Sequence, residues 1–137
     1  MDVKTTFLNG KIEEEVYIEQ PKGFKLDGKE SHECKLKKAQ YGLKQAPRAW
    51  YARIDNYLWG LGFSKSIVDS NLYIKVVKNY PLIPVPYVDD LFLTGEEHLI
   101  AQCKMEFATE FEMKALSLLH YFLALEVRQK TGEIFLS

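Results

Sequence analysis

Two adjacent aspartates, Asp89 and Asp90, stand inside an apolar stretch of the kind that forms buried strands. The residues around them predict burial or partial burial: Val85, Val88, Leu91, Phe92 and Leu93. Unpaired buried carboxylates are costly, so something has to compensate them. One interpretation is a divalent cation such as Mg²⁺, which takes oxygen ligands. The other is the tip of a tight hairpin, where Asp bonds to its own backbone. Taken alone, the pair favours the hairpin tip.

A third carboxylate, Asp2, precedes Val3 in a segment that we predict to be the end of a strand. If that strand end lies beside the Asp89–Asp90 pair, the three carboxylates would complete a site for two metal ions. The alternative is a solvated terminal acid, since chain ends are usually exposed. The metal site therefore depends on how the strands are arranged.

The overall composition constrains function only weakly. The 137 residues are 47% hydrophobic with a formal net charge of −1, which fits one domain or part of a larger one. The charges are nevertheless unevenly distributed, because six basic residues and no acidic one lie between Lys35 and Arg53. Such a stretch can bind phosphates, or it can form a solvated basic face.

Cysteine usage and hydropathy indicate an intracellular protein. Cys34 and Cys103 show no CxxC spacing, so we predict reduced, buried structural thiols. The residues after Met1 are mostly polar and show no signal-peptide pattern, and no apolar run approaches the roughly 20 residues of a membrane span. We therefore expect no membrane partner.

Hydrophobic periodicity predicts several strands and two helices. The predicted strands are Glu15–Glu19, Cys34–Tyr41, Ile67–Val77 (with Leu72, Ile74 and Val76 on one face), Leu82–Leu93, and a terminal hairpin of His120–Val127 and Glu133–Leu136. One helix begins near Pro47 and closes at Gly60 and Gly62. A second follows Gly95, with apolar residues at Leu99, Cys103, Phe107 and Phe111. Hairpins in place of regular βαβ units predict an α+β fold with a largely antiparallel sheet.

Four stretches together carry a specific resemblance. They are MDVKTTFLNG with its sequel EEEVYIEQPKGF, then YGLKQAPRAWY, YVDDLFLTG and FEMKALSLLHYFLALEV. In this order, and over nearly the whole chain, they resemble the reverse transcriptase of copia-type LTR retrotransposons. The resemblance makes an unrelated small α+β protein with an acidic hairpin the weakest interpretation.

The resemblance implies a polymerase palm-like antiparallel sheet packed on two helices, with a C-terminal hairpin. It implies an RNA-directed DNA polymerase that extends a primer on an RNA or DNA template with dNTP. Two Mg²⁺ ions, or Mn²⁺ in their place, would be held by Asp2, Asp89, Asp90 and the backbone of Val3. Asp2 would bridge both ions, with Asp89 or Asp90 as the other principal ligand.

The same resemblance assigns residues to substrate binding. Four match the nucleotide pocket: Phe7, Tyr41, Gly42 and Tyr87. Phe7 would crowd the 2′-OH of a ribonucleotide, although on the residues alone it could equally be a core aromatic. Without the resemblance, Tyr41-Gly42 would be an ordinary strand-to-helix turn. Lys44 and Arg48 would contact template phosphates or else lie on a solvated helix face.

Two further segments have a role under the resemblance. Trp50 keeps the apolar helical register, so we predict a core residue rather than a platform on which bases stack. The hairpin from His120 to Leu136 resembles the segment that grips the primer end, with an ordinary sheet-edge hairpin as the alternative.

Several residues depart from the family pattern. Pro81, Pro84 and Pro86 stand in the strand before YVDD, and we expect them to interrupt it because proline lacks a ladder donor. The other departures are Ala115, Ser117 and Ala124. They raise a second hypothesis, in which the chain is a degenerate, non-catalytic remnant of such an element.

For domain organisation, we expect residues 1–137 to be one partial palm domain. The fingers, the rest of the thumb and the RNase H region would lie outside these residues, and we expect this polypeptide alone not to synthesise DNA. The rest of a retrotransposon polyprotein would then be a partner. We expect an intracellular location, in cytoplasmic particles or the nucleus.

Overall fold

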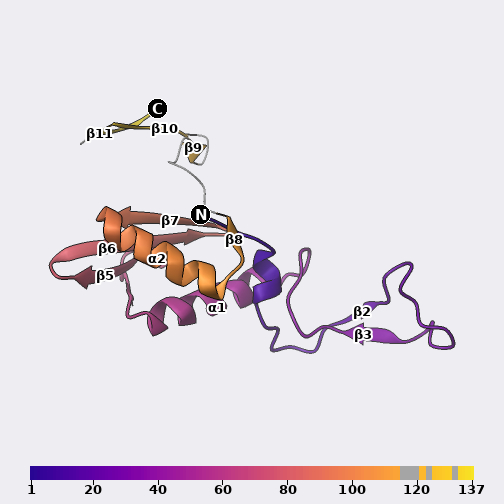
Figure 1. Ribbon diagram of the computed structural model, residues 1–137. Helices are drawn as coiled ribbons and strands as arrows, with labels where there is room; N and C mark the ends of the chain where they lie inside the picture. Colours follow the sequence, from indigo (N-terminus) through magenta and orange to yellow (C-terminus); the bar gives the residue numbers. More distant parts are fainter. Residues whose placement is uncertain (115–120, 123–124, 131–132) are drawn as a thin grey trace.

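The computed structural model describes residues 1–114, 121–122, 125–130 and 133–137 (Figure 1). Its helical elements are the 3₁₀ helix η1 (Thr6–Asn9), α1 (Ala46–Gly60) and α2 (Glu97–Glu110). Its strands are β1 (Asp2–Val3), β2 (Tyr17–Glu19), β3 (Glu33–Lys35), β4 (Ser64–Lys65), β5 (Tyr73–Val77), β6 (Tyr80–Tyr87), β7 (Asp90–Gly95), β8 (Met113–Lys114), β9 (Tyr121–Phe122), β10 (Leu125–Lys130) and β11 (Glu133–Leu136).

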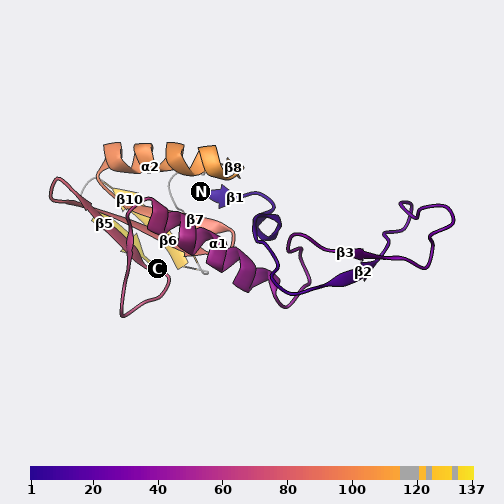
Figure 2. The same ribbon diagram turned by 90° about the horizontal axis from the view of Figure 1, so that it is seen from below.

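Six strands form the main sheet in the order β4-β5-β6-β7-β1-β8, and the recorded pairings are antiparallel. Figure 1 shows α1 on one side of this sheet and the C-terminal strands on the other, and in Figure 2, seen from below, α1 crosses in front of the sheet. The strands β9, β10 and β11 form a separate antiparallel sheet. The predicted α+β class, the two helices and the C-terminal hairpin are confirmed, while Thr131 and Gly132 lie outside the described residues.

The core lies between the main sheet and the two helices. Helix α1 buries Trp50, Ile54 and Leu58, which recur every four residues along one face. Helix α2 contributes Leu99, Cys103 and Phe107 in the same way. The helices meet through aromatic rings, with Tyr57 at 5.2 Å from Phe107 and 5.1 Å from Phe111 between ring centroids. This packing holds α1 against α2.

Strand β5 begins later than its apolar pattern predicts. The predicted start at Ile67 is wrong, because Ile67 and Val68 are fully exposed and the strand begins at Tyr73. Polar side chains take the preceding backbone into a turn: the Asn71 N–H donates to Asp69 Oδ1 at 2.9 Å, and the Val68 N–H to Ser66 Oγ at 3.2 Å. Local bonds of this kind compete with a strand ladder.

The segment between η1 and α1 projects from the body as a two-stranded arm, β2 with β3 (Figure 1). The predicted strand Cys34–Tyr41 is correspondingly shorter, since β3 covers only Glu33–Lys35. The prediction that Cys34 is buried is wrong: Cys34 is exposed, because no second layer in the described part of the chain covers this arm. Cys103 is buried as predicted, and its burial raises the pKa of the thiol to about 11.

The proline-rich strand β6 is continuous, so the expected interruption does not occur. Pro84 pairs with Leu93 and Pro86 with Leu91. The Leu91 N–H donates to the Met1 carbonyl at 2.7 Å, so Leu91 turns its backbone groups towards β1. Pro86 and Leu91 are therefore a non-hydrogen-bonded pair, and no ladder donor is lost to β7. On its other side β6 pairs with β5 only as far as Leu82, so Pro84 and Pro86 lie at a free edge.

Within the described part of the chain, neither helix is long and apolar enough to cross a bilayer.

We expect Leu58→Ala to lower the free energy of unfolding by about 2–5 kcal/mol, because Leu58 is fully buried and its truncation leaves a cavity. The matched control is Trp59→Ala on the exposed face of the same helix, which should change it by less than about 1 kcal/mol. Urea denaturation measures both. Equal losses in the two variants would contradict the assignment of the buried helix face.

Candidate active site

Strands β1 and β7 bring two of the predicted catalytic carboxylates together. Asp2 lies directly opposite Asp90 in the antiparallel register. Opposite residues of such a pair project from the same face, with Cβ atoms about 4.5–5.5 Å apart. Residues 88 positions apart in the sequence thus become neighbours. Their side chains lie on the face away from Leu91, which is buried against the helices.

The third carboxylate, Asp89, lies in the tight turn between β6 and β7. Tyr87 pairs with Asp90, so Val88 and Asp89 form a two-residue loop. Val88 has a φ of 52°, which is costly for a β-branched side chain. Among the loop residues only Val88 has a positive φ, as in the II′ hairpin turn, which normally has glycine at this position.

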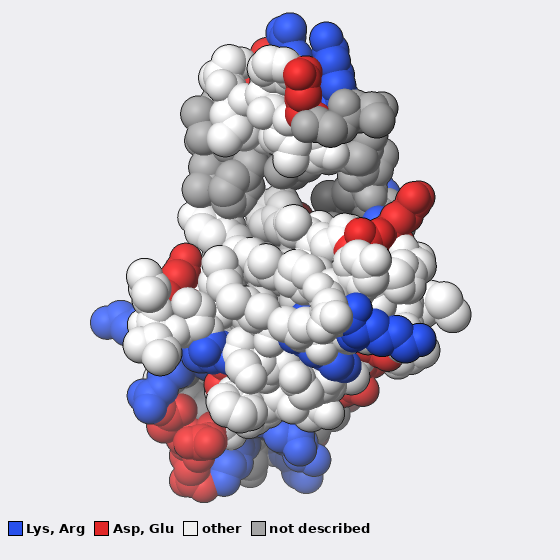
Figure 3. All heavy atoms as spheres, turned by 90° about the vertical axis from the view of Figure 1, so that its left-hand side faces the viewer, with Lys and Arg blue, Asp and Glu red and all other residues white. Residues whose placement is uncertain are grey.

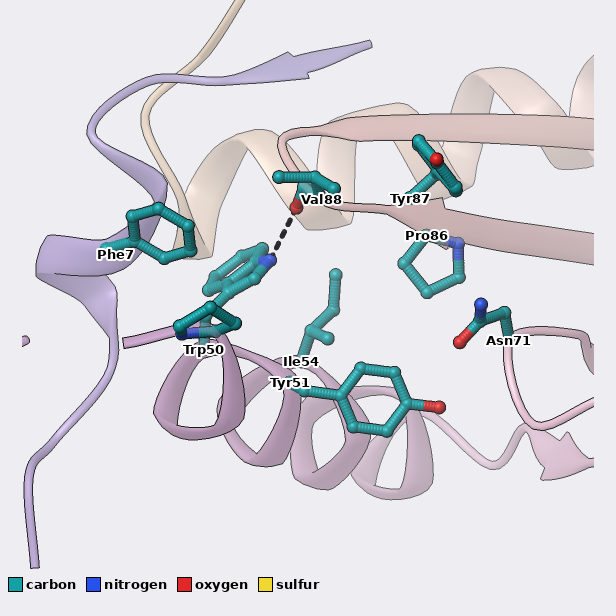
Figure 4. Close-up of a pocket in the computed structure, with 9 residues that line it drawn as sticks. Phe7, Trp50, Tyr51, Ile54, Asn71, Pro86, Tyr87 and Val88 are labelled. Carbon is teal, nitrogen blue, oxygen red and sulfur yellow. Dashed lines mark hydrogen bonds between the residues drawn. The ribbon is translucent and has the colours of Figure 1, made fainter. Parts of the chain in front are cut away.

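Hydrogen bonds hold this turn from two sides. The indole N–H of Trp50 donates to the Val88 carbonyl at 2.6 Å (Figure 4). The backbone N–H of Val3 donates to the Asp89 carbonyl at 2.7 Å. The Val3 carbonyl, predicted as a backbone metal ligand, accepts a bond from the Thr6 hydroxyl at 2.7 Å. The turn is thereby tied to both α1 and β1.

Negative charge is concentrated at this strand end. Partial burial, followed by the Asp89 carboxylate, raises the pKa of Asp90 above its ordinary range; Asp2 adds to this and the Met1 ammonium opposes it. In the part of the chain that the structure describes, no ion pair involves any of the three aspartates.

The donor set suits a hard divalent cation, since carboxylate oxygens are the ligands that Mg²⁺ prefers. The fit is incomplete in one respect: across the described ranges, no three acidic, His or Cys side chains are already gathered as a metal-ligand set. The backbone brings Asp2 and Asp90 opposite each other and places Asp89 in the adjoining turn, but the three side chains do not yet converge on one point.

Of the residues predicted for the nucleotide pocket, Phe7 and Tyr87 line a cavity beside this turn, and Tyr41 packs against Phe7. The Phe7 ring packs edge-on against Tyr41, with 4.4 Å between centroids and 66° between planes. Phe7 is buried, so it is part of the core as well as a neighbour of Tyr41. Gly42 has a φ of 91°, which a side chain would disfavour. Tyr87 is exposed and lies on the other side of the turn.

A cavity of about 300 Å³ lies between α1 and the β6–β7 turn (Figure 4). Phe7 and Tyr87 both contribute to its wall, which is mainly apolar. The lining residues are Phe7, Pro47, Trp50, Tyr51, Ile54, Asn71, Pro86, Tyr87 and Val88. The cavity lies on the helix side of the sheet, opposite the face that carries Asp2 and Asp90.

The predicted nucleic-acid contacts are at the start of α1. Lys44 and Arg48 are exposed, and neither takes part in an ion pair within the described ranges. Two other basic residues of the same stretch are neutralised, because Lys35 pairs with Glu15 and Arg53 with Glu110. Figure 3 shows basic and acidic side chains interspersed around a broad uncharged area on the face at the β5–β6 end.

Two contributions escaped sequence reasoning. Spacing predicted that Trp50 is buried, which is confirmed, but gave no partner for its N–H. Lys114 pairs with Asp2 in the register, so it lies on the same face as the carboxylates. The sole signal for Lys114 was its place in FEMK, directly after a predicted helix. The departures Ala115, Ser117 and Ala124, and the start of the predicted primer hairpin at His120, lie outside the described residues.

We expect Asp90→Asn to make the protein more stable at pH 7. Because the folded protein raises the pKa of Asp90 above 3.8, folding favours its protonated form. The contribution of this group to stability is complete below pH 3.8 and is lost as the pH rises through the raised pKa. Urea denaturation at pH 7 and pH 3 should show a gain for the variant at pH 7 alone. Asp27→Asn, in the exposed loop of the arm, is the control, and a gain of equal size at both pH values would contradict the assignment.

Comparison with known proteins agrees with the motifs. The family model described as reverse transcriptase (RNA-dependent DNA polymerase) matches residues 1–137. The chain is 42% identical over 135 residues to the retrovirus-related Pol polyprotein from transposon TNT 1-94 of Nicotiana tabacum, covering 96% of this chain and 10% of the polyprotein. It is 37% identical over 138 residues to that from transposon RE1 of Arabidopsis thaliana, covering 100% of this chain and 9% of the polyprotein.

A yeast relative is similar over the same range. The putative transposon Ty5-1 protein of Saccharomyces cerevisiae is 35% identical over 139 residues, covering all of this chain and 45% of that protein. The chain thus spans about a tenth of the plant polyproteins and under half of the yeast protein. No solved structure matches significantly. The predicted copia-type resemblance is confirmed: the chain belongs to the reverse transcriptase (RNA-dependent DNA polymerase) family.

Proposed function

We propose that this chain carries the catalytic carboxylates of an RNA-directed DNA polymerase within a retrotransposon Pol polyprotein. The observation that supports it most is the register that sets Asp2 against Asp90, with Asp89 in the adjoining turn. The reaction would be attack of a primer 3′-OH on the α-phosphate of a dNTP, with pyrophosphate leaving. Template and primer are the nucleic-acid partners under this proposal, and the sheet would be a polymerase palm.

In this proposal Asp2, Asp89 and Asp90 hold two Mg²⁺ ions, which Mn²⁺ could replace. When bound, such ions lower the pKa of an attacking hydroxyl and neutralise a leaving phosphate. The chain itself supplies position and charge. Asp2 and Asp90 present carboxylates from neighbouring strands. Partial burial, and after it the Asp89 carboxylate, raises the pKa of Asp90, with a smaller contribution from Asp2. Bound cations would relieve this cost of negative charge.

The proposed nucleotide site is formed by Phe7, Tyr41, Gly42 and Tyr87. Phe7 is held rigidly, because it is buried in the core and packs against the Tyr41 ring. A fixed aromatic at this place could exclude a 2′-OH by crowding it. At Gly42 nothing lies within 4 Å of where a Cβ would stand, so the positive φ rather than space explains the glycine. Lys44 and Arg48 are exposed and could bind template phosphates.

The relatives named above are parts of Pol polyproteins, so the remainder of such a polyprotein is the proposed protein partner. Activity is proposed for that assembly and not for these 137 residues alone. The proposed location is inside the cell, in cytoplasmic particles or the nucleus, as expected for an element that copies itself through RNA.

The degenerate remnant remains the second candidate. The departures that favour it are the three prolines of β6 and the residues Ala115, Ser117 and Ala124. The prolines no longer support it, because β6 is continuous: Pro81 pairs with Val76 of β5, and Leu82 to Tyr87 pair with β7. The remnant hypothesis therefore rests on the three residues outside the described ranges.

The test is to replace the matching segment of the tobacco TNT 1-94 polyprotein with residues 1–137 and to measure primer extension. We expect Mg²⁺-dependent extension by the chimera. Asp2→Asn and Asp89→Asn should each lower the rate about 100-fold or more, since metal-borne stabilisation amounts to several kcal/mol. The matched control is Asp69→Asn, an exposed aspartate whose replacement keeps an oxygen acceptor for the Asn71 N–H.

Two outcomes would count against the proposal. Near-normal extension by the Asp89→Asn chimera would overturn the carboxylate assignment. A folded chimera that does not extend primers, although the tobacco parent does, would favour the degenerate remnant.

A further inference from the structure

We propose that Trp50 is a positioning residue for the catalytic turn, acting through its indole N–H. This inference rests on the proposed function, because it concerns how Asp89 is aimed in the same site. Trp50 does not touch the carboxylates. Its N–H donates to the Val88 carbonyl at 2.6 Å, from a side chain that is 4% exposed.

The geometry of the turn makes such a bond consequential. Asp89 is flanked by two peptide groups, and the carbonyl of each is held by one donor. Trp50 holds the Val88 carbonyl, and the Val3 N–H holds the Asp89 carbonyl at 2.7 Å. Fixing both peptide planes fixes the direction in which the Asp89 side chain leaves the backbone. Loss of either bond frees one plane to rotate.

Backbone strain at Val88 favours rotation of the Val88–Asp89 peptide plane once a bond is lost. A valine at a φ of 52° is strained and persists only where its surroundings impose that conformation. The net contribution of one hydrogen bond to stability is of the same order as the strain of one such residue. The Trp50 bond is therefore strong enough to decide whether the strained turn is kept.

Side-chain packing does not provide that support. Val88 is 53% exposed, and the cavity of about 300 Å³ lies beneath the turn. Figure 4 shows the Trp50 N–H reaching Val88 at the end of this cavity. The turn is thus held mainly by directional bonds, and removing one is not compensated by neighbouring apolar contacts.

The donor is held in place by core packing. The Trp50 ring packs edge-on against Phe111, with 5.4 Å between centroids and 80° between planes. Ile54 and Leu58 continue the same buried face of α1. The core therefore sets the position of the N–H before any substrate binds, which is the property a positioning residue needs.

The main variant is Trp50→Phe, which keeps an aromatic ring and removes the N–H. A second variant carries 3-benzothienylalanine at position 50, which keeps the two-ring shape and replaces the N–H with sulfur, in case the smaller ring prevents folding. The matched control is Trp59→Phe on the exposed face of the same helix.

The first measurement is amide hydrogen exchange in the 137-residue chain. We expect the Val3 N–H, which is bonded to the Asp89 carbonyl, to exchange about five- to tenfold faster in both Trp50 variants, as loss of one hydrogen bond predicts. The Phe63 N–H, which donates to the Leu58 carbonyl at 3.1 Å away from the turn, should not change. A general loss of stability would accelerate both amides.

The second measurement is primer extension by the chimera with the tobacco polyprotein. We expect kcat to fall about tenfold in the Trp50 variants, with KM for dNTP changed less than about twofold, because misaimed carboxylates weaken the transition state more than substrate binding. Trp59→Phe should leave both parameters unchanged.

The outcomes separate the two proposals. Unchanged Val3 exchange, or faster exchange with an unchanged kcat, overturns the role of Trp50 while leaving the catalytic aspartates intact. Near-normal extension by Asp89→Asn overturns the proposed function itself. Equal acceleration of the Val3 and Phe63 amides shows a merely structural Trp50 and also overturns the inference.

Discussion

The site depends on the pairing of β1, a strand of only two residues, between β7 and β8. This pairing sets Asp2 opposite Asp90 and lets the Val3 N–H bond to the Asp89 carbonyl. A strand of two residues forms too few ladder hydrogen bonds to stay paired alone, so neighbouring residues must anchor it. Val3 is buried in the core, Lys4 forms an ion pair with Glu112 at 2.7 Å, and the Thr6 hydroxyl closes the chain back on Val3.

The hydrophobic core reaches the site through α1. The residues that anchor this helix under the sheet, Ile54 and Leu58, share a face with Trp50, which meets the turn. The packing of α1 in the core thereby sets the hydrogen bond between Trp50 and Val88 at the β6–β7 turn. The Phe7–Tyr41 contact extends the same arrangement to the proposed nucleotide site. Changes deep in the core should therefore be transmitted to the turn.

The sequence predicted the structure correctly where a helical spacing of apolar residues coincides with burial of that helix face. Trp50, Ile54 and Leu58 recur as a helix requires, and α1 forms where this pattern predicts. The prediction failed where a local polar bond or a missing neighbour decides. The hydrogen bonds made by Ser66 and Asp69 shift the start of β5 towards the C-terminus. Cys34 is exposed because nothing in the described part of the chain covers its strand. Neither effect leaves a periodic pattern in the sequence.

The candidate site was predictable in part for the same reason. The adjacent aspartates and their apolar flanks marked a turn, and the motif order tied Asp2 to it. The bond from Trp50 to Val88 was not predictable, because it depends on where a helix face meets a turn 38 residues later. Backbone strain at Val88 is likewise invisible in a sequence, since valine is an ordinary strand residue.

The prolines of β6 connect these observations. Pro84 and Pro86 lie where β5 has stopped pairing, so their missing N–H groups leave nothing unpaired in the ladder. An edge of this kind also resists pairing with a foreign strand. Among the described residues, no strand pairs with the end of the hairpin on that side, and the space beneath is the cavity lined by Pro86 and Asn71. A turn that holds a strained valine and has no paired strand on its β6 side depends on bonds from outside the hairpin as well as on the β6–β7 pairing. Helix α1 and strand β1 each supply one, so the tolerance of prolines at the edge and the dependence on Trp50 follow from the same feature of the sheet.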